Sequence, residues 1–390
     1  MGNPSVVAIV ELNDRVWYST NGGSTWADLG AGPWVGTITD INISPARADA
    51  LLGRDIVVCT AVPGFAAGDI YIVGDTTTWT QLSIADPALL PVASYAWYAV
   101  KCEPNWLGGR SVVAVGFDGV GTYITVIRTS PLHLGFALAI WPMTATGATL
   151  PTSANIRSAS LALPSDFDST SPMGIVAYVG VNSLGVSGSD DVYRQDFMTT
   201  RKLEITTNIP VASIDFKGTI SGGTLFAGAF FAGAVPWVYS TANPQSNMPT
   251  WMLTAKPPTG PVLPANGNIV VKMAPDYDAS KTVYATTGLA WYLGGGFGLD
   301  DESSFSYSTN GGLSFNGISF IDTAVSTLSD VMPAPDNKTL FLSTSNGVTN
   351  NSLWKTTAMP PAVGGWERVN LRTATSVGTP RRERHLYYQA

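Results

Sequence analysis

The sequence predicts an all-β fold built from repeated four-stranded antiparallel units, and three observations support this prediction. The chain has 40 Gly and 26 Pro in 390 residues and is rich in Val, Thr, Ile, Tyr and Trp, a composition typical of many short strands joined by turns. Strand-like runs that lead to a turn and an apolar anchor recur along its whole length. Long stretches with the period of an amphipathic helix are missing from the sequence.

The recurring anchors divide the chain into seven units. They follow one another 48 to 64 residues apart, which is close to four-stranded blades with loop insertions. The anchors are Trp26, Trp79, Trp141, Leu203, Trp251, Phe315 and Trp366. This spacing predicts a single seven-bladed β-propeller over residues 1–380, followed by a basic tail at residues 381–390. That tail is expected either to be free or to dock as a strand on a neighbour.

A second repeat supports the same division. Strand-like runs that end in proline precede several of the turns, at residues 39–45, 98–104, 160–164, 270–276 and 329–336. We interpret these runs as the innermost strands of their blades. The first unit has only three strand-like runs, at residues 6–12, 15–19 and 25–29. We therefore expect a C-terminal strand at residues 372–378 to complete the first blade and close the ring, which removes exposed sheet edges.

One turn sequence occurs twice: STNGGSTW at residues 19–26 returns as STNGGLSF at residues 308–315. Consecutive glycines allow positive φ in a tight hairpin, and Ser, Thr and Asn side chains can bond the backbone of the turn. The pattern resembles the Asp-box, or BNR repeat, of the sialidase, sortilin and xyloglucanase propellers, with Asn in the place of Asp. The residues that match the motif are Ser19, Asn21, Gly23, Trp26, Ser308, Asn310, Gly312 and Phe315.

Charged residues recur at equivalent positions of the innermost strands. When the runs are aligned on their prolines, four charged residues fall on the same side of their strands: Asp40, Lys101, Lys272 and Asp330. We expect Asp215 to lie on that side as well. These side chains should then face the central channel. Mixed acidic and basic groups in a narrow channel are most simply water-bridged ion pairs, since buried charges need partners, and an ion or ligand site is the alternative.

The longest distinctive loop covers residues 288–302. Its Trp291, Tyr292 and Phe297 are candidates for stacking on sugar rings or anchoring a protein, because aromatic side chains offer large apolar area at low entropic cost. An equally supported alternative is a local lid folded over the sheet. The acidic run at the end of the loop, Asp300, Asp301 and Glu302, lacks the alternating spacing of a calcium loop and is only a weak metal candidate.

Several function classes fit the sequence poorly. The net charge of −7 would repel a phosphate backbone, so we expect no nucleic-acid partner. Sialidases carry an Arg-Ile-Pro signature that does not occur here, and xyloglucanases form their cleft between two propellers, whereas one propeller uses this whole chain. The two histidines, His133 and His385, lie in unlike contexts and support neither a zinc site nor a catalytic triad. We expect no cofactor.

The sequence thus favours a non-catalytic binding or structural propeller that engages a protein or glycan partner through loops on one face. The alternative is a glycan-active hydrolase of the Asp-box class. Low lysine content and richness in Thr, Ser, Gly and Trp favour a secreted or cell-surface location, whether or not a leader was removed, and no apolar run is long enough for membrane insertion. Cys59 and Cys102 are either two buried thiols or one disulfide.

Overall fold

The fold is described from a computed structural model of the chain. The residues that it describes are 6–10, 15–48, 51–62, 67–74, 76–82, 95–117, 121–129, 135–142, 156–183, 190–197, 199–206, 208–230, 236–259, 267–289, 304–318, 327–345, 350–358, 365–373 and 387–389.

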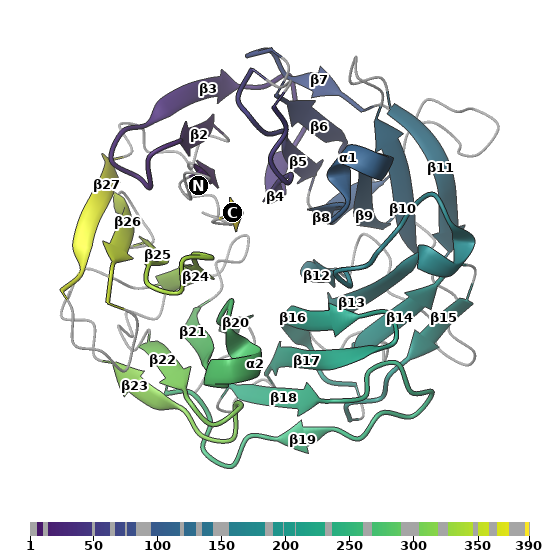
Figure 1. Ribbon diagram of the computed structural model, residues 1–390, viewed down its shortest axis with the longest axis vertical. Helices are drawn as coiled ribbons and strands as arrows, with labels where there is room; N and C mark the ends of the chain where they lie inside the picture. The colour runs from purple at the N-terminus through teal and green to yellow at the C-terminus, as the bar shows by residue number, and fades with distance from the viewer. Residues whose placement is uncertain are drawn as a thin grey trace. The chain divides into compact units, whose positions relative to one another are not determined.

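The described residues form seven four-stranded antiparallel sheets, which are the blades of a seven-bladed β-propeller (Figure 1). The predicted fold class is confirmed. The first three sheets contain β28 (Tyr387–Gln389), β1 (Val6–Val10), β2 (Arg15–Ser19) and β3 (Ala27–Ala31); β4 (Thr37–Ile43), β5 (Ile56–Ala61), β6 (Ile70–Val73) and β7 (Thr80–Gln81); and β8 (Ala96–Cys102), β9 (Ser111–Phe117), β10 (Thr122–Thr129) and β11 (Gly135–Pro142).

The other four sheets contain β12 (Ser158–Ala162), β13 (Val176–Asn182), β14 (Val192–Asp196) and β15 (Thr199–Lys202); β16 (Val211–Thr219), β17 (Gly222–Ala229), β18 (Trp237–Thr241) and β19 (Met252–Leu253); β20 (Gly267–Met273), β21 (Val283–Leu289), β22 (Ser304–Ser308) and β23 (Asn316–Ile318); and β24 (Thr327–Pro333), β25 (Leu340–Ser345), β26 (Asn350–Thr356) and β27 (Glu367–Thr373). The short helices of the described residues are α1 (Trp106–Gly109), α2 (Tyr277–Ser280) and the 3-10 turn η1 (Pro172–Gly174).

The chain divides into two compact units. The first unit comprises Met1–Asp28, Phe226–Ser240 and Trp251–Ala390, and the second comprises Leu29–Leu225 and Thr241–Thr250. The site described below lies within the second unit.

The second strand of a sheet is the most apolar, because it is buried on both faces between its neighbours. All residues of β5, β9 and β13 are buried, and their sequences IVVCTA, SVVAVGF and VAYVGVN are almost continuously apolar. Cys59 on β5 and Cys102 on β8 are both buried and free, so the thiol alternative holds and the disulfide does not. Burial raises the pKa of each thiol well above its usual range.

The C-terminal strand completes the first sheet, as expected, but at a different place in the sequence. β28 pairs antiparallel with β1, with Val7 opposite Tyr388. The expected segment 372–378 was wrong, because its beginning is already used: β27 continues to Thr373, which pairs with Asn350 of β26. β28 lies within residues 381–390, the segment that we predicted as a basic tail.

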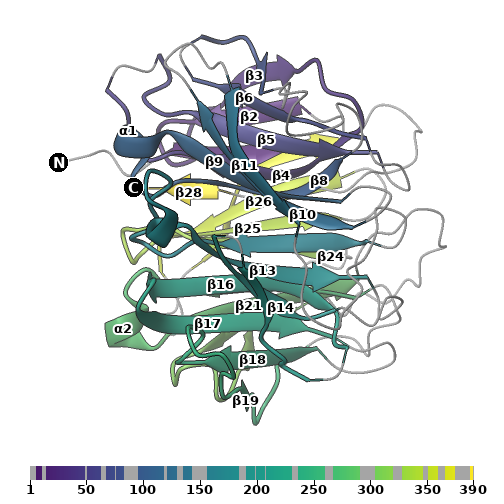
Figure 2. The same ribbon diagram turned by 90° about the vertical axis from the view of Figure 1, so that its right-hand side faces the viewer.

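Antiparallel strands place the turn between first and second strands at one end of each sheet. In the second unit these first turns are residues 44–55 between β4 and β5, 103–110 between β8 and β9, and 163–175 between β12 and β13. Figure 2 shows α1, which belongs to the second of these turns, at this end of β8 and β9. We call this end of the sheets the turn edge.

Candidate functional site

The two repeated turns have the same hydrogen-bond network. In the first copy the Ser19 hydroxyl accepts a bond from the Gly23 amide at 2.8 Å, and Asn21 Oδ1 accepts one from the Thr25 amide at 2.8 Å. In the second copy Ser308 accepts from Gly312 at 3.0 Å, and Asn310 accepts from Ser314 at 3.0 Å. Both glycine pairs have positive φ, as predicted. The network satisfies the backbone of the turn and leaves no group arranged for chemistry.

A third turn of this type, at residues 241–250, was not recognised from the sequence. Thr241 donates to Asn243 Oδ1 at 2.8 Å, and the same Oδ1 accepts from the Thr250 amide at 3.2 Å. The inserted residues between Asn243 and Thr250 hide the motif. Its signal is Thr-x-Asn followed, after the insertion, by Thr-Trp.

The predicted loop candidates lie outside the described residues. These are Trp291, Tyr292 and Phe297 as ligand-binding residues and Asp300, Asp301 and Glu302 as weak metal candidates. Within the part of the chain that the structure describes, no group of three or more His, Cys, Asp or Glu side chains could hold a metal ion. Nor is any helix there both long and apolar enough to span a membrane.

The charged residues predicted to line the channel all lie on the first strand of a sheet. They are Asp40 on β4, Lys101 on β8, Asp215 on β16, Lys272 on β20 and Asp330 on β24. The structure gives two of the carboxylates a backbone role.

Asp40 is 7% exposed, and its carboxylate accepts hydrogen bonds from the Ile41 and Val100 amides, each at 2.9 Å. Its neighbour Asn42 accepts similarly from the Cys102 amide. These two side chains of β4 thus accept hydrogen bonds from backbone amides of β8, the first strand of the next sheet. Without them, the buried amides at the edge of β8 would lack acceptors, which costs free energy. Asp330 is 3% exposed and accepts from the Val331 amide at 2.8 Å.

Among the described carboxyl groups with a shifted pKa, Asp191 has the largest shift. It lies just before β14, is fully buried, and accepts from the Val192 and Ile205 amides at 2.7 and 3.1 Å. Burial raises its pKa to about 6, although Lys202 lies 3.7 Å from Oδ2. Perturbed carboxyls are often functional. The Asp191 carboxylate is not exposed to solvent. It links β14 to the segment after β15 through the hydrogen bonds that it accepts from two backbone amides, which is a structural role.

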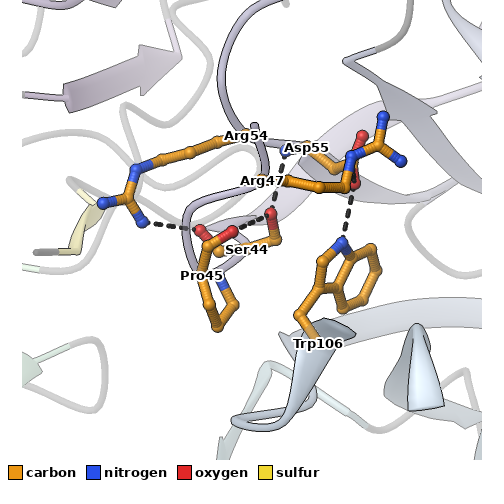
Figure 3. Close-up of polar contacts among 6 residues, drawn as sticks. All are labelled: Ser44, Pro45, Arg47, Arg54, Asp55 and Trp106. Carbon is orange, nitrogen blue, oxygen red and sulfur yellow. Dashed lines mark hydrogen bonds and ion pairs between the residues drawn. The ribbon is translucent and has the colours of Figure 1, made fainter. Parts of the chain in front are cut away.

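The first turn of the sheet β4–β7 contains a buried charge cluster (Figure 3). Asp55 is fully buried, and its Oδ2 accepts a hydrogen bond from Trp106 Nε1 at 2.7 Å. Arg47, 1% exposed, places Nε 3.4 Å from the same oxygen. Arg54 donates to the Ser44 carbonyl at 2.9 Å, and the Ser44 hydroxyl accepts from the Asp55 amide. Three charged side chains of one turn are thus directed inwards.

The next turn repeats this inward arrangement. Glu103, which follows β8, is fully buried and accepts from the amide of Ser169 at 2.9 Å and from its hydroxyl at 3.0 Å. Ser111 adds an amide donor at 3.2 Å. Burial raises the pKa of Glu103, and these donors oppose the rise. Asp55–Trp106 and Glu103–Ser169 therefore join three successive first turns.

The exposed described residues of the first two turns are uncharged, whereas the third turn also exposes Ser165, Asp166 and Thr170. The large side chains exposed there are Leu51 at 66%, Leu107 at 67% and Met173 at 85%, one from each of the three turns. The other exposed residues among those described in the first two turns are uncharged: Ala46, Ala48, Gly53, Asn105 and Gly108. Asp49 lies outside the described residues, and Arg110 is half-buried. We call Leu51, Leu107 and Met173, with their three turns, the turn surface.

The turn surface is the reverse of an ordinary exposed turn, which buries leucine and exposes arginine. Sequence reasoning missed it, because neither Leu51 nor Leu107 belongs to a motif. In the first two turns the exposed described residues offer uncharged, mostly apolar contact area.

Comparison with known proteins identifies the fold. No protein-family model and no curated protein matches the sequence. Among solved structures, a periplasmic gluconolactonase from Pseudomonas aeruginosa is 10% identical with a TM-score of 0.57, covering 99% of each chain. A hypothetical selenium-binding protein from Sulfolobus tokodaii is 10% identical with a TM-score of 0.58, covering 99% of this chain and 93% of its own.

A xyloglucanase from Xanthomonas campestris is 11% identical with a TM-score of 0.56 over 94% of this chain. The likeness is one of fold. This chain spans about half of that enzyme, 53% of its length. The propeller scaffold is therefore shared with proteins that are named for different activities, so the function must be argued from the site.

Proposed function

We propose that this chain is a non-catalytic binding propeller that engages a protein partner through its turn surface. The observation that carries the proposal is the inverted burial of the first turns: Arg47, Arg54, Asp55 and Glu103 are buried, while Leu51, Leu107 and Met173 are exposed. Contiguous exposed apolar patches mark interaction sites, and Leu51 and Leu107 lie on neighbouring turns that the Asp55–Trp106 bond joins.

Rigidity supports the binding role. The Arg47 amide donates to the Gly53 carbonyl at 2.8 Å, and the Arg110 amide donates to the Trp106 carbonyl at 3.0 Å, so each turn is closed by its own backbone. The buried joints then hold the turns to one another. A surface that is already ordered loses little conformational entropy when a partner binds.

A protein fits the turn surface better than a glycan does. Its described large exposed side chains are Leu and Met, which pack against other apolar side chains, whereas sugar rings stack on aromatic faces. A glycan partner would instead be bound by Trp291, Tyr292 and Phe297. A glycan array with the Trp291→Ala/Tyr292→Ala variant tests that second route, and saturable binding lost in the variant would favour it.

Four of the described carboxylates argue against the hydrolase alternative. Glycoside hydrolysis uses two carboxyl groups about 5 to 10 Å apart beside an open cleft. Asp40, Asp55, Glu103 and Asp191 are buried and accept hydrogen bonds from the protein. Release of reducing ends from polysaccharide substrates by the purified chain would contradict the non-catalytic proposal.

We further propose that the chain belongs to the Asp-box propeller class and acts outside the cytoplasm. The matching networks of Ser19–Asn21 and Ser308–Asn310 support the class assignment. Low lysine content and richness in Thr, Ser, Gly and Trp support the location. Cell fractionation with an antibody to the chain tests it directly, and recovery only in the cytosolic fraction would contradict it.

The partner test uses tagged chains purified gently from source cells. We expect a stoichiometric complex with the wild-type chain that is lost from the Leu51→Glu/Leu107→Glu variant. The matched control is Val35→Glu, because Val35 is 62% exposed but precedes β4, at the end of the strand opposite the turn. Equal recovery of the partner with the double variant would overturn the turn surface as the binding site.

A further inference from the structure

Met173 has the most exposed large apolar side chain among the described residues, at 85%. It lies on the third turn, residues 163–175, all of which the structure describes. We propose that Met173 is a site of reversible oxidation by peroxides and that its sulfoxide weakens binding at the turn surface. The first part of this inference stands on Met173 alone, and the second part rests on the proposed function.

The third turn holds the Met173 side chain in solvent. Met173 is the middle residue of η1, between Pro172, whose ring fixes its own φ, and Gly174. The Gly174 amide donates to the Ser171 carbonyl at 2.9 Å, and the Gly174 carbonyl accepts from the Asp168 amide at 3.0 Å. A Cβ at Gly174 would lie 2.5 Å from the Asp168 carbonyl oxygen, so the backbone here is closely packed. The backbone around Met173 is therefore fixed, and the thioether stays accessible to small oxidants.

The other described methionines provide a scale of accessibility. Met248, which lies outside the turn surface, is 82% exposed, and Met252 is 49% exposed. Met273 and Met332 are buried, at 6% and 8%. An oxidant must reach the sulfur to react with it, so we expect Met173 and Met248 to react first. Met248 is thus a control that is matched in accessibility but not in position.

Oxidation converts the apolar thioether of Met173 into a polar group. The sulfur donates an electron pair to one oxygen of a hydroperoxide, so that an S–O bond forms and the O–O bond breaks. The leaving oxygen takes up the proton and departs as water or an alcohol. The sulfur is oxidised and the peroxide is reduced. The product is methionine sulfoxide, which methionine sulfoxide reductases return to the thioether.

The sulfoxide would lie within the proposed contact area. Glu103 joins the turn of Met173 to the turn of Leu107, because its buried carboxylate accepts from the Ser169 amide and hydroxyl at 2.9 and 3.0 Å. A partner that covers both turns must bury the sulfoxide oxygen, and burial of a polar group without a hydrogen-bond donor costs free energy. Oxidation therefore lowers the affinity for an apolar partner. The fold itself is unaffected, since the Met173 side chain is not part of the core.

Peptide mass mapping of the full chain after graded treatment with hydrogen peroxide tests the first part. Under native conditions we expect one added oxygen at Met173 and Met248 before Met252, and at Met273 and Met332 last. The two methionine sulfoxide reductases, one for each sulfoxide epimer, should then remove the oxygen from Met173. Oxidation of Met173 as slow as that of the buried methionines, or a sulfoxide that the reductases leave in place, overturns the reversible site.

The second part is tested with the protein that co-purifies with the unoxidised wild-type chain from source cells. The chain is oxidised and freed of peroxide before this protein is added. We expect the oxidised wild type to bind about tenfold more weakly, which is the loss of one buried methionine contact. Met173→Leu keeps the apolar volume but has no sulfur, so the same treatment should leave its binding unchanged. The matched control, Met248→Leu, should lose affinity as the wild type does.

Equal losses of affinity in oxidised wild type and oxidised Met173→Leu overturn the effect of the sulfoxide on binding. Binding by the unoxidised chain would still support the proposed function in that case. If no protein co-purifies with the unoxidised chain, the proposed function fails and the effect on binding fails with it. The peptide map then still decides whether Met173 is a site of oxidation.

Discussion

Trp106 Nε1 donates a 2.7 Å hydrogen bond to Oδ2 of Asp55, and this bond joins two successive sheets of the second unit at their turn edge. Both residues are buried, at 1% and 0% exposure. The bond brings α1 against the turn 44–55. It also gives the buried Asp55 carboxylate a partner, so the described charged residues of this turn can be buried while leucine and alanine are exposed.

Replacement of the indole should show how much this joint contributes. In Trp106→Phe the buried Asp55 carboxylate loses a donor, and we expect the free energy of unfolding to fall by about 2 to 3 kcal/mol. Denaturant titration measures the change. Trp79→Phe is the matched control, because Trp79 Nε1 donates to the neutral Leu29 carbonyl and its loss should cost about 1 kcal/mol. Equal losses would show that the Asp55 charge is not what the indole stabilises.

Gly74 should be intolerant of any side chain, because Asp55 occupies the space beside it. A Cβ at Gly74 would lie 2.0 Å from Asp55 Oδ1 and 2.9 Å from the Arg54 carbonyl oxygen. We expect Gly74→Ala to destabilise the chain by about 1 to 3 kcal/mol, as overpacking does. Gly365→Ala is the control, since a Cβ there meets nothing within 4 Å. A stable Gly74→Ala variant would contradict the tight fit around Asp55.

The stability of the repeated turns should depend more on the side-chain oxygen of Asn21 than on its side-chain NH2 group. In Asn21→Asp one carboxylate oxygen keeps the bond from the Thr25 amide and the other can accept from the Thr25 hydroxyl, so we expect little change in stability. Asn21→Ala removes the Oδ1 acceptor and the Nδ2 donor and should cost about 1 to 2 kcal/mol. Thermal unfolding compares the two variants. A larger loss in Asn21→Asp than in Asn21→Ala would refute this account of the turn.

Asp191 should make stability depend on pH in a defined direction. Its pKa in the folded chain is about 6, above the value of about 3.9 in an unfolded chain, so its contribution is fully present below pH 4 and is lost as pH rises through 6. Asp191→Asn keeps an acceptor for Ile205 and removes the charge. We expect the variant to gain up to about 3 kcal/mol relative to the wild type between pH 4 and 7. Denaturant titrations at a series of pH values measure this gain, and a constant difference would contradict the raised pKa.

Local sequence signals were sufficient for much of the fold. Turn and strand patterns such as residues 15–19 and the Gly22–Gly23 pair are set by neighbouring residues, and the structure has β2 at Arg15–Ser19 and positive φ at both glycines. The closing strand was misplaced because its position depends on which C-terminal residues β26 and β1 recruit as partners. No local pattern records that competition between distant strands.

The turn surface could not be predicted in the same way. Hydropathy places Leu51 inside and Arg47 outside, and the structure reverses both. The reversal depends on Trp106, which lies far along the chain from Asp55 and provides its hydrogen bond. The proline-ended repeat did place Asp40 on the first strand of a sheet, but the bond from the Val100 amide to its carboxylate depends on how two sheets pack together.

Site-specific photo-crosslinking from position 107 tests the central claim most directly. A photoreactive amino acid replaces Leu107 in the full chain expressed in source cells, and the matched chain carries it at Val35. The account predicts a discrete crosslinked protein, either another copy or a different partner, from position 107 and none from position 35. Crosslinks from position 35 alone, or none from position 107, would contradict a binding role for the turn surface.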